Sequence, residues 1–289
     1  MHVASTEADE LPTIRATVRE VNVIFTVTDK HGHFKRDLKS DDLAVLDDGK
    51  PPVALRSFSS ETDLPLRVGL ILDVSGSITD RFSFEQESAL KFVTHTLRPK
   101  TDAAFVLGFD SVPFLAQDFT DNSELLSKGV RSMTPGGGSA VRDAIQMAVD
   151  DKLGSLGSDK PVRKIVILIS DGEDNQSRIT TAQAIDAARR SEVVIYSIST
   201  NTSNTVTRGD KLLTRLAEET GGRAFFPNKV EDVVKAFETI QDELRSQYAV
   251  SYKPADFRSD GRYRKIEIAA RTNKNLVVRS RKGYFAPSE

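Results

Sequence analysis

Three short polar segments of this 289-residue chain carry side chains that could bind a metal ion. They are residues 73–77 (DVSGS), residues 134–139 (TPGGGS) and residues 170–174 (SDGED). Between them they offer carboxylate and hydroxyl oxygens, the ligands that hard cations such as Mg²⁺ prefer. The aspartates and serines therefore predict an all-oxygen metal site, provided that the fold brings the three segments together.

The first and third segments each follow a strand-like run. Residues 67–72 and 164–169 are almost continuously apolar, which is typical of strands buried on both faces of a parallel sheet. Residues 103–109 and 193–198 are also strand-like. One of the helical stripes between these strands consists of Val141, Ala144, Ile145, Ala148 and Val149. Strands that alternate with helices predict a doubly wound, mostly parallel sheet, in which ligands bind beyond the carboxyl ends of the strands.

Helix-terminus signals support this alternation. Ser83 with Gln86, and Thr180 with Gln183, match the capping box that begins many helices. Gly221 follows a helical pattern and predicts its C-terminal cap.

Both flanks of the central region have strand patterns. Residues 21–28 alternate between apolar and polar side chains, and Asp48-Gly49 is a hairpin-turn signal. Strand patterns return at residues 248–252, 263–269 and 276–281. Neither flank buries a core alone, but flanks of 65 and 44 residues together match the roughly 100 residues of a β-sandwich.

The sequence therefore predicts an α/β fold with an inserted domain. Residues 1–65 and 246–289 would form the two halves of one β-sandwich, and residues 66–245 would form a doubly wound, mostly parallel domain inserted between them. Two separate small β pieces that pack on the central domain are the alternative.

The composition excludes several classes of protein. The chain has no Cys, which rules out disulfides, a thiol nucleophile, an Fe–S cluster and thiolate metal sites. Its net charge of −2 argues against a nucleic-acid binder. No apolar run is long enough to span a bilayer. Residues 1–12 are polar and acidic and do not form a secretory signal, so any such signal would have been removed upstream of Met1.

The order and spacing of the polar segments resemble those of a known family. Asp73-x-Ser75-x-Ser77, then Gly-Gly-Gly-Ser139, then Ile-Ser-Asp171-Gly is similar to the metal-ion-dependent adhesion site (MIDAS) of von Willebrand factor type A (VWFA) domains. The resemblance spans about residues 66–245 and implies a Rossmann-like VWFA domain there.

The resemblance also implies a set of ligands and a function. Carried over by position, the metal ligands would be Asp73, Ser75, Ser77, Ser139 and Asp171. They would hold Mg²⁺, with Mn²⁺ or Ca²⁺ as alternatives, and would leave a coordination position for an Asp or Glu carboxylate of a partner protein. Ser139 stands where the family usually has Thr, so the hydroxyl is kept but a methyl that helps fix the rotamer is lost. The expected function is non-enzymatic, metal-dependent protein binding of the cell-adhesion type.

The flanks resemble bacterial VWFA-related proteins of the acidobacterial type. The matching residues are 47–50 (DDGK) and 281–284 (RKGY). Bacterial relatives of this layout are commonly exported, which implies a secreted, periplasmic or cell-surface location.

Other interpretations stay open at this point. Residues 73–77 alone could be a helix-capping turn, and the site could be vestigial in a purely structural domain. An oxygen-rich Mg²⁺ site could also serve hydrolysis or phosphoryl transfer, although no well-placed His base or phosphate-reading Lys is apparent. The glycines of residues 134–139 lack the Gly-Lys-Ser/Thr of a phosphate loop.

The remaining polar features are expected to be solvated. Glu173 and Asp174 would form an acidic loop, and His31 and His33 a turn without a third zinc ligand. His95, on a helix whose apolar face is elsewhere, would face solvent or the edge of the domain. The basic residues of the C-terminal flank favour a solvated sandwich face over a surface for an acidic partner. They are Arg258, Arg262, Arg264, Lys265, Arg271, Lys274, Arg279, Arg281 and Lys282.

Overall fold

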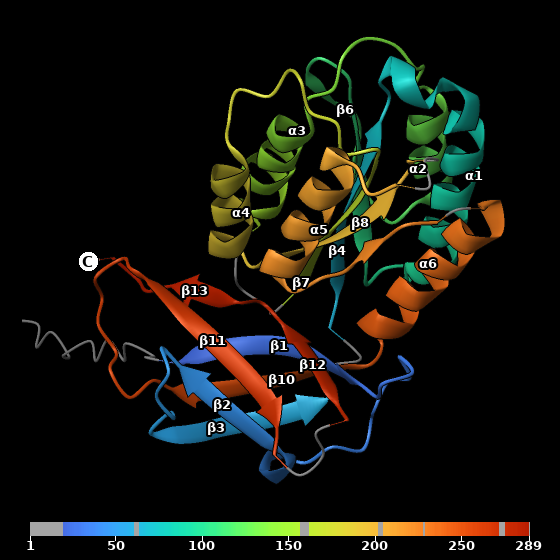
Figure 1. Cartoon of the computed structure of the whole chain (residues 1–289). Helices are drawn as coiled ribbons and strands as arrows, with labels where there is room; N and C mark the ends of the chain where they lie inside the picture. Colours follow the sequence, from blue (N-terminus) through green and yellow to red (C-terminus); the bar gives the residue numbers. More distant parts are fainter. Residues whose placement is uncertain are drawn as a thin grey trace, which may run out of the picture.

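A six-stranded sheet occupies the centre of the α/β region (Figure 1). The computed structural model describes residues 20–60, 64–156, 162–201, 205–227, 229–271 and 275–288. The strands are β4 (Leu66–Asp73), β5 (Ala103–Phe109), β6 (Pro113–Thr120), β7 (Arg163–Ser170), β8 (Val193–Ser199) and β9 (Ala224–Phe225). Their order is β6-β5-β4-β7-β8-β9, and β6 alone among them runs antiparallel to its neighbour. The predicted doubly wound, mostly parallel sheet is therefore confirmed.

The chain reverses its direction of travel across this sheet between β4 and β7. After β4 it proceeds outward to β5 and β6, and it then returns to place β7 on the other side of β4. The carboxyl ends of β4 and β7 consequently flank the topological switch point, where open α/β sheets bind their ligands.

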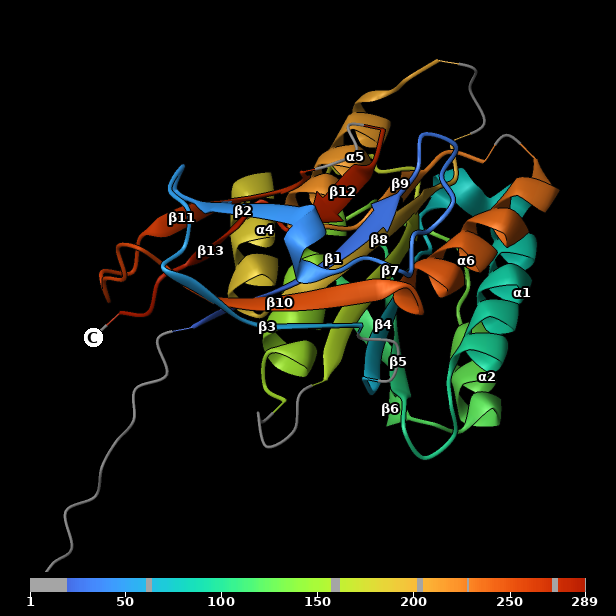
Figure 2. The same cartoon turned by 90° about the horizontal axis from the view of Figure 1, so that it is seen from below.

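Helices cover both faces of the sheet (Figures 1 and 2). One face carries α1 (Thr79–Thr96), α2 (Ser123–Arg131) and α6 (Val230–Leu244). The other carries α3 (Val141–Met147) with the π-helical turn Ala148–Leu153, α4 (Thr181–Arg190) and α5 (Arg208–Thr220). Alternate residues of each strand supply the two cores: in β4, Leu70 and Leu72 face α1 and α6, whereas Ile71 faces α3.

Local signals define some helix ends correctly and one incorrectly. Thr180 and Gln183 form the predicted capping box of α4, and Gly221 caps α5 in the left-handed conformation at φ 93°. The capping box predicted at Ser83 is wrong, because a 3₁₀ turn (Gly76–Ile78) leads directly into α1 at Thr79 and leaves Ser83 inside the helix.

The flanks form two antiparallel sheets beneath the central domain (Figure 1). One has the order β12-β1-β10-β3, built from β12 (Val277–Ser280), β1 (Val21–Thr28), β10 (Gln247–Lys253) and β3 (Ala54–Ser60). The other has the order β13-β11-β2, built from β13 (Gly283–Phe285), β11 (Tyr263–Ala270) and β2 (Leu43–Asp47), which follows a 3₁₀ turn at Ser40–Asp42. Both sheets mix strands from the two flanks and share one apolar core, so the flanks are not two separate β pieces.

The boundaries of the inserted domain follow from these elements. We propose that it runs from residue 66 to residue 245, between the halves 1–65 and 246–289, because β4 begins at Leu66 and α6 ends at Leu244. Residues 1–19 lie outside the described part of the chain. Among the described residues, no helix is both long enough and apolar enough to cross a bilayer.

The turn at Asp48-Gly49 is tight, as its sequence predicts, but it does not join a hairpin. Both residues have positive φ, 50° and 78°, and Asp47 bridges to Lys50. β2 then stays in one flanking sheet while β3 enters the other, so the turn carries the chain between the two sheets.

Ion pairs correct the expectation of a solvated basic face on the C-terminal flank. Arg264 is only 9% exposed and pairs with Asp260 at 2.8 Å. Arg279 pairs with Glu243 of α6 at 3.4 Å, and Arg281 pairs with Glu192 beside β8 at 2.8 Å. The last two pairs join the sandwich to the inserted domain.

Candidate metal centre

Four of the five predicted ligands lie in one chain of hydrogen bonds at the carboxyl ends of β4 and β7. The Ser75 N–H donates to Asp73 Oδ1 at 2.8 Å, and the hydroxyls of Ser75 and Ser77 lie 3.0 Å apart. The Ser77 hydroxyl donates to Asp171 Oδ2 at 2.7 Å. The two aspartates thus belong to one polar cluster, which a contact across 94 positions of the sequence, from Ser77 to Asp171, completes.

The glycine-rich segment contacts this cluster through its backbone. The Gly136 N–H donates to the Val74 carbonyl at 2.6 Å, and the Gly76 N–H donates to the Gly137 carbonyl at 3.3 Å. Gly137 has φ 77°, and a Cβ there would lie 3.1 Å from the Cβ of Asp110. Because a side chain would be strained and crowded at this position, glycine is what lets the loop approach.

Ser139 is held in place by its backbone while its hydroxyl has no partner. Its N–H donates to Asn175 Oδ1 at 3.1 Å, and its carbonyl accepts from the N–H groups of Asn175 and Gln176 at 3.0 Å each. Ser139 is 4% exposed, and its buried Oγ makes no hydrogen bond. The structure therefore does not link this hydroxyl directly to the other four residues. A buried hydroxyl without a partner is unusual and points to a missing ligand.

Asp73 is a buried carboxylate surrounded by neutral donors. It is 1% exposed, and the Ser170 hydroxyl donates to its Oδ2 at 2.6 Å. Burial raises the pKa of Asp73 to about 6, against the lowering effect of hydrogen bonds from Ser170 and Ser75, and the charge of Asp171 raises it further. Among the described residues no cation pairs with either aspartate, so a bound cation would supply the compensating charge.

The donor set fits a hard divalent cation. It consists of two carboxylates and three hydroxyls, and one of those hydroxyls is buried without a partner. Within the described part of the chain, no cluster of three or more His, Asp or Glu side chains could hold a metal ion. Binding at this edge would therefore depend on the serines as much as on the aspartates.

Glu173 and Asp174, two acidic residues close to the predicted ligands, differ in their exposure to solvent. Glu173 is exposed, as expected. Asp174 is not solvated: its side chain is 4% exposed and accepts from Arg142 at 2.8 Å and from the Ser177 hydroxyl at 2.7 Å. Burial alone would raise the pKa of Asp174, but these hydrogen bonds lower it below its ordinary value. Asp174 thus anchors the loop after β7 to α3.

The histidines provide no alternative metal centre in the part that the structure describes. His31 and His33 are exposed in a turn, and His33 Nδ1 lies 3.1 Å from Asp29 Oδ2. The side chain of His95 lies outside the described residues.

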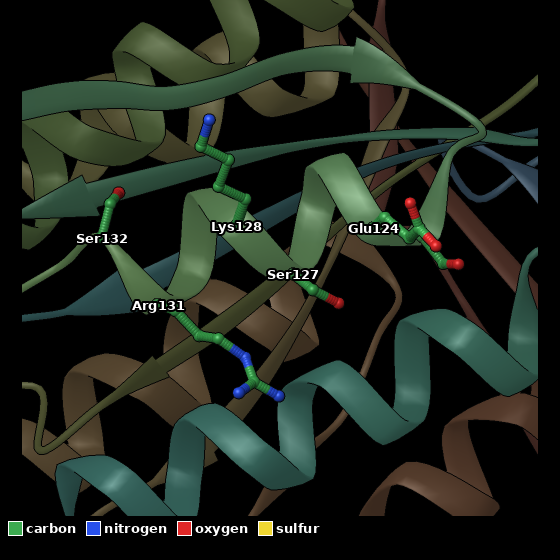
Figure 3. Close-up of a pocket in the computed structure, with 6 residues that line it drawn as sticks. Glu124, Ser127, Lys128, Arg131 and Ser132 are labelled. Atoms are coloured by element: carbon green, nitrogen blue, oxygen red, sulfur yellow. The ribbon is translucent and has the colours of Figure 1, made fainter.

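A hollow along α2 is not a continuation of the site (Figure 3). It is lined by Ser123, Glu124, Ser127, Lys128, Arg131 and Ser132, which all belong to α2 or its C-terminal end. It contains none of the predicted ligands.

Two residues that support the site were not among the predicted ligands. Ser170 belongs to the third polar segment, so its residue type was visible in the sequence, but nothing there indicated that its hydroxyl contacts Asp73. Asn175 Oδ1 accepts a hydrogen bond from the Ser139 N–H. The two residues are 36 positions apart, and no local sequence signal indicates such a contact.

The fold and the site together define a doubly wound α/β domain with an oxygen-rich centre at its switch point. The sequence profile of the family described as "von Willebrand factor type A domain" matches residues 68–243, more than half of the chain. The chain belongs to this family, whose fold is used for metal-dependent protein binding or adhesion. The finer resemblance to acidobacterial-type proteins stays a prediction.

Solved structures share this fold at low sequence identity. Proximal thread matrix protein 1 from the mussel byssus, in a form with a zinc-occupied MIDAS motif, is 16% identical with a TM-score of 0.54, covering 68% of this chain and 49% of that one. BatB from Bacteroides thetaiotaomicron is 16% identical with a TM-score of 0.51, covering 63% and 100%. The VWF domain of the type V pili tip protein Mfa5 from Porphyromonas gingivalis is 15% identical with a TM-score of 0.50, covering 62% and 94%.

The chain spans about half the length of the mussel protein that it matches. No curated protein sequence is significantly similar to it.

Proposed function

We propose that this protein is a non-enzymatic module that binds a partner protein through a divalent cation. The cation, Mg²⁺ with Mn²⁺ or Ca²⁺ as alternatives, would be held by Asp73, Ser75, Ser77, Ser139 and Asp171. The observation that carries the proposal is the hydrogen-bonded chain from Asp73 to Asp171, which joins two carboxylates and two hydroxyls and includes no described Lys, Arg or His side chain. The unpartnered Ser139 hydroxyl supports it as the fifth ligand.

The ligand set favours an acidic partner. A bound cation acts as a Lewis acid toward an incoming anion. The two carboxylates formally balance the 2+ charge, but five oxygen ligands leave one position of an octahedral ion open, and an Asp or Glu carboxylate of the partner would complete the coordination. The backbone hydrogen bonds of Gly136 and Gly137 to residues 74–76, and of Ser139 to residues 175 and 176, would keep the hydroxyls in place for this contact.

Exposed apolar side chains on the same edge of the sheet supply contact area for a protein. Val112 is 62% exposed in the turn between β5 and β6, Val206 is 76% exposed before α5, and Phe226 is 47% exposed after β9. All three follow the carboxyl end of a strand, as the candidate ligands do. Apolar side chains around a polar centre are typical of a protein-binding surface.

The structural neighbours support an adhesive role outside the cytoplasm. A pili tip protein and a byssus matrix protein share the fold, and the byssus protein has a zinc-occupied MIDAS motif. By analogy, we propose that this chain acts in a secreted, periplasmic or cell-surface location.

Calorimetric titration with Mg²⁺ alone tests the metal centre. We expect saturable binding to the wild type and none to Asp73→Ala. The matched control is Asp151→Ala, because Asp151 is exposed and lies outside the site, and this variant should bind like the wild type. Equal, negligible binding by the wild type and Asp73→Ala would remove the basis of the proposal. Capture of a partner by immobilised protein should then occur in Mg²⁺ and be lost both in EDTA and with Asp73→Ala.

A further inference from the structure

A cavity of about 410 Å³ lies between the sandwich and the inserted domain, at the end of the central sheet opposite the candidate metal centre. Lys164 and Val193, near the amino ends of β7 and β8, line it from the domain side. Ile24 of β1 and Ala249 of β10 line it from the sandwich side. Its volume lies within the roughly 300–1,000 Å³ of small-molecule sites.

The cavity wall carries more positive than negative charge. Its cations are Lys164, Arg189, Arg279 and Arg281, and its acids are Glu192 and Glu243. The arginines are already paired, since Arg279 contacts Glu243, Arg281 contacts Glu192, and Arg189 contacts Glu219 outside the cavity. Lys164, which is partly buried, makes no ion pair or side-chain hydrogen bond with any described residue. One cation in the wall is thus available to a ligand.

Arg281 itself is held by Glu192 and the Asn22 carbonyl, and its Nε is buried out of reach of a ligand in the cavity. The rest of the lining includes apolar side chains, among them Leu64, Leu156 and Val194.

We propose that this cavity binds a small amphipathic organic acid. Its carboxylate would pair with the Lys164 ammonium group, and its apolar body would lie against Ile24, Leu64 and Val194. A charged head pairs with the free ammonium group, and an apolar body fits the apolar walls. The site is separate from the metal centre and does not depend on the proposed function.

Titration of the full chain with octanoate tests this assignment. We expect saturable binding of one octanoate per chain, with octanol and inorganic phosphate each binding at least tenfold more weakly, because octanol lacks the charge and phosphate lacks the apolar body. Lys164→Met should weaken octanoate binding at least tenfold. Lys253→Met is the matched control, since Lys253 is exposed on β10 and does not line the cavity, and it should leave the affinity unchanged.

Amide chemical shifts of the wild type locate the ligand without any variant. Octanoate should perturb residues 192–194 and β10, and leave residues 73–77 and 136–139 unchanged. The proposal fails if octanoate does not bind, if Lys164→Met binds it as the wild type does, or if the perturbed amides lie at the carboxyl edge of the sheet. Phosphate binding that equals octanoate binding would also overturn it, because the apolar walls would then have no role.

Discussion

A buried carboxylate at each end of the central sheet can be compared, Asp73 at the carboxyl ends of the strands and Glu243 at the amino ends, and their surroundings differ. Asp73 and Glu243 are each 1% exposed, and burial raises the pKa of both. Glu243 has a cation beside it, Arg279 at 3.4 Å, and accepts from the Tyr196 hydroxyl at 3.1 Å. Asp73 is surrounded by hydroxyl and amide donors only. The difference separates a carboxylate that joins two parts of the fold from one that we propose binds a metal ion.

The largest expected effect is on stability at the Glu243 end. Glu243→Gln keeps the size of the side chain but leaves Arg279 without its counter-ion. Because the pair is mostly removed from water, we expect the free energy of unfolding to fall by about 2–3 kcal/mol, as when one partner of a buried pair is removed. Urea denaturation at neutral pH measures it. An unchanged midpoint would mean that Glu243 is not charged in the fold, and the contrast with Asp73 would be lost.

The same carboxyl-to-amide exchange at Asp73 should leave the stability of the fold unharmed and weaken metal binding instead. Asp73→Asn keeps an oxygen acceptor for the Ser75 N–H and places an NH₂ group opposite the Ser170 hydroxyl, which can accept from it, and it removes a buried charge that no described cation balances. In EDTA we therefore expect an unfolding free energy equal to or above that of the wild type. Mg²⁺ affinity should fall at least tenfold, about 1.4 kcal/mol, which calorimetry measures. A variant that is destabilised in EDTA and still binds Mg²⁺ normally would assign Asp73 to structure alone.

The partly buried pair of Asp174 and Arg142 extends the comparison, because Asp174 lies three residues from Asp171 but resembles Glu243 in having a cationic partner. Asp174→Asn should cost about 1 kcal/mol at pH 6. The pKa of Asp174 is lowered in the folded state, so its contribution is present above the unfolded pKa of about 3.9 and is lost as the pH falls through the folded value. The gap between wild type and variant should shrink between pH 5 and pH 3. A gap that stays constant over that range would argue against a charged pair.

The sequence predicted best those parts of the site that follow from a single strand. Residues 67–72 and 164–169 are so apolar that their burial, and the positions of Asp73 and Asp171 beyond them, could be inferred without any other information. Elements that alternate between buried and exposed side chains without a long apolar run were not predicted. The edge strand β6 has no continuous apolar run, and α2 was missed although Asn122 caps it with two hydrogen bonds.

Contacts between distant segments could not be predicted. Arg142 and Asp174 are 32 positions apart, and their pairing depends on how α3 packs beside the loop after β7. The ion pairs of Arg279 and Arg281 could not be predicted either. These arginines occupy alternate positions along β12 and just after it, a pattern typical of a strand face exposed to solvent. Their partners Glu243 and Glu192 come from the inserted domain, so only the docking of the sandwich on that domain makes these arginines structural.

The smallest expected effect concerns Ser139, the predicted ligand that no hydrogen bond links to the others. Ser139→Ala removes a buried hydroxyl that has no partner, so stability in EDTA should change by less than about 0.5 kcal/mol. Mg²⁺ affinity should nevertheless fall about threefold to tenfold. Ser139→Thr keeps the hydroxyl and restricts its rotamer, so it should bind Mg²⁺ at least as well as the wild type, provided that the added methyl fits beside a residue that is 4% exposed. Calorimetry on the two variants side by side measures this difference. If Ser139→Ala binds Mg²⁺ as tightly as Ser139→Thr, the hydroxyl is not a ligand, and the centre is reduced to the four residues that the hydrogen bonds already join.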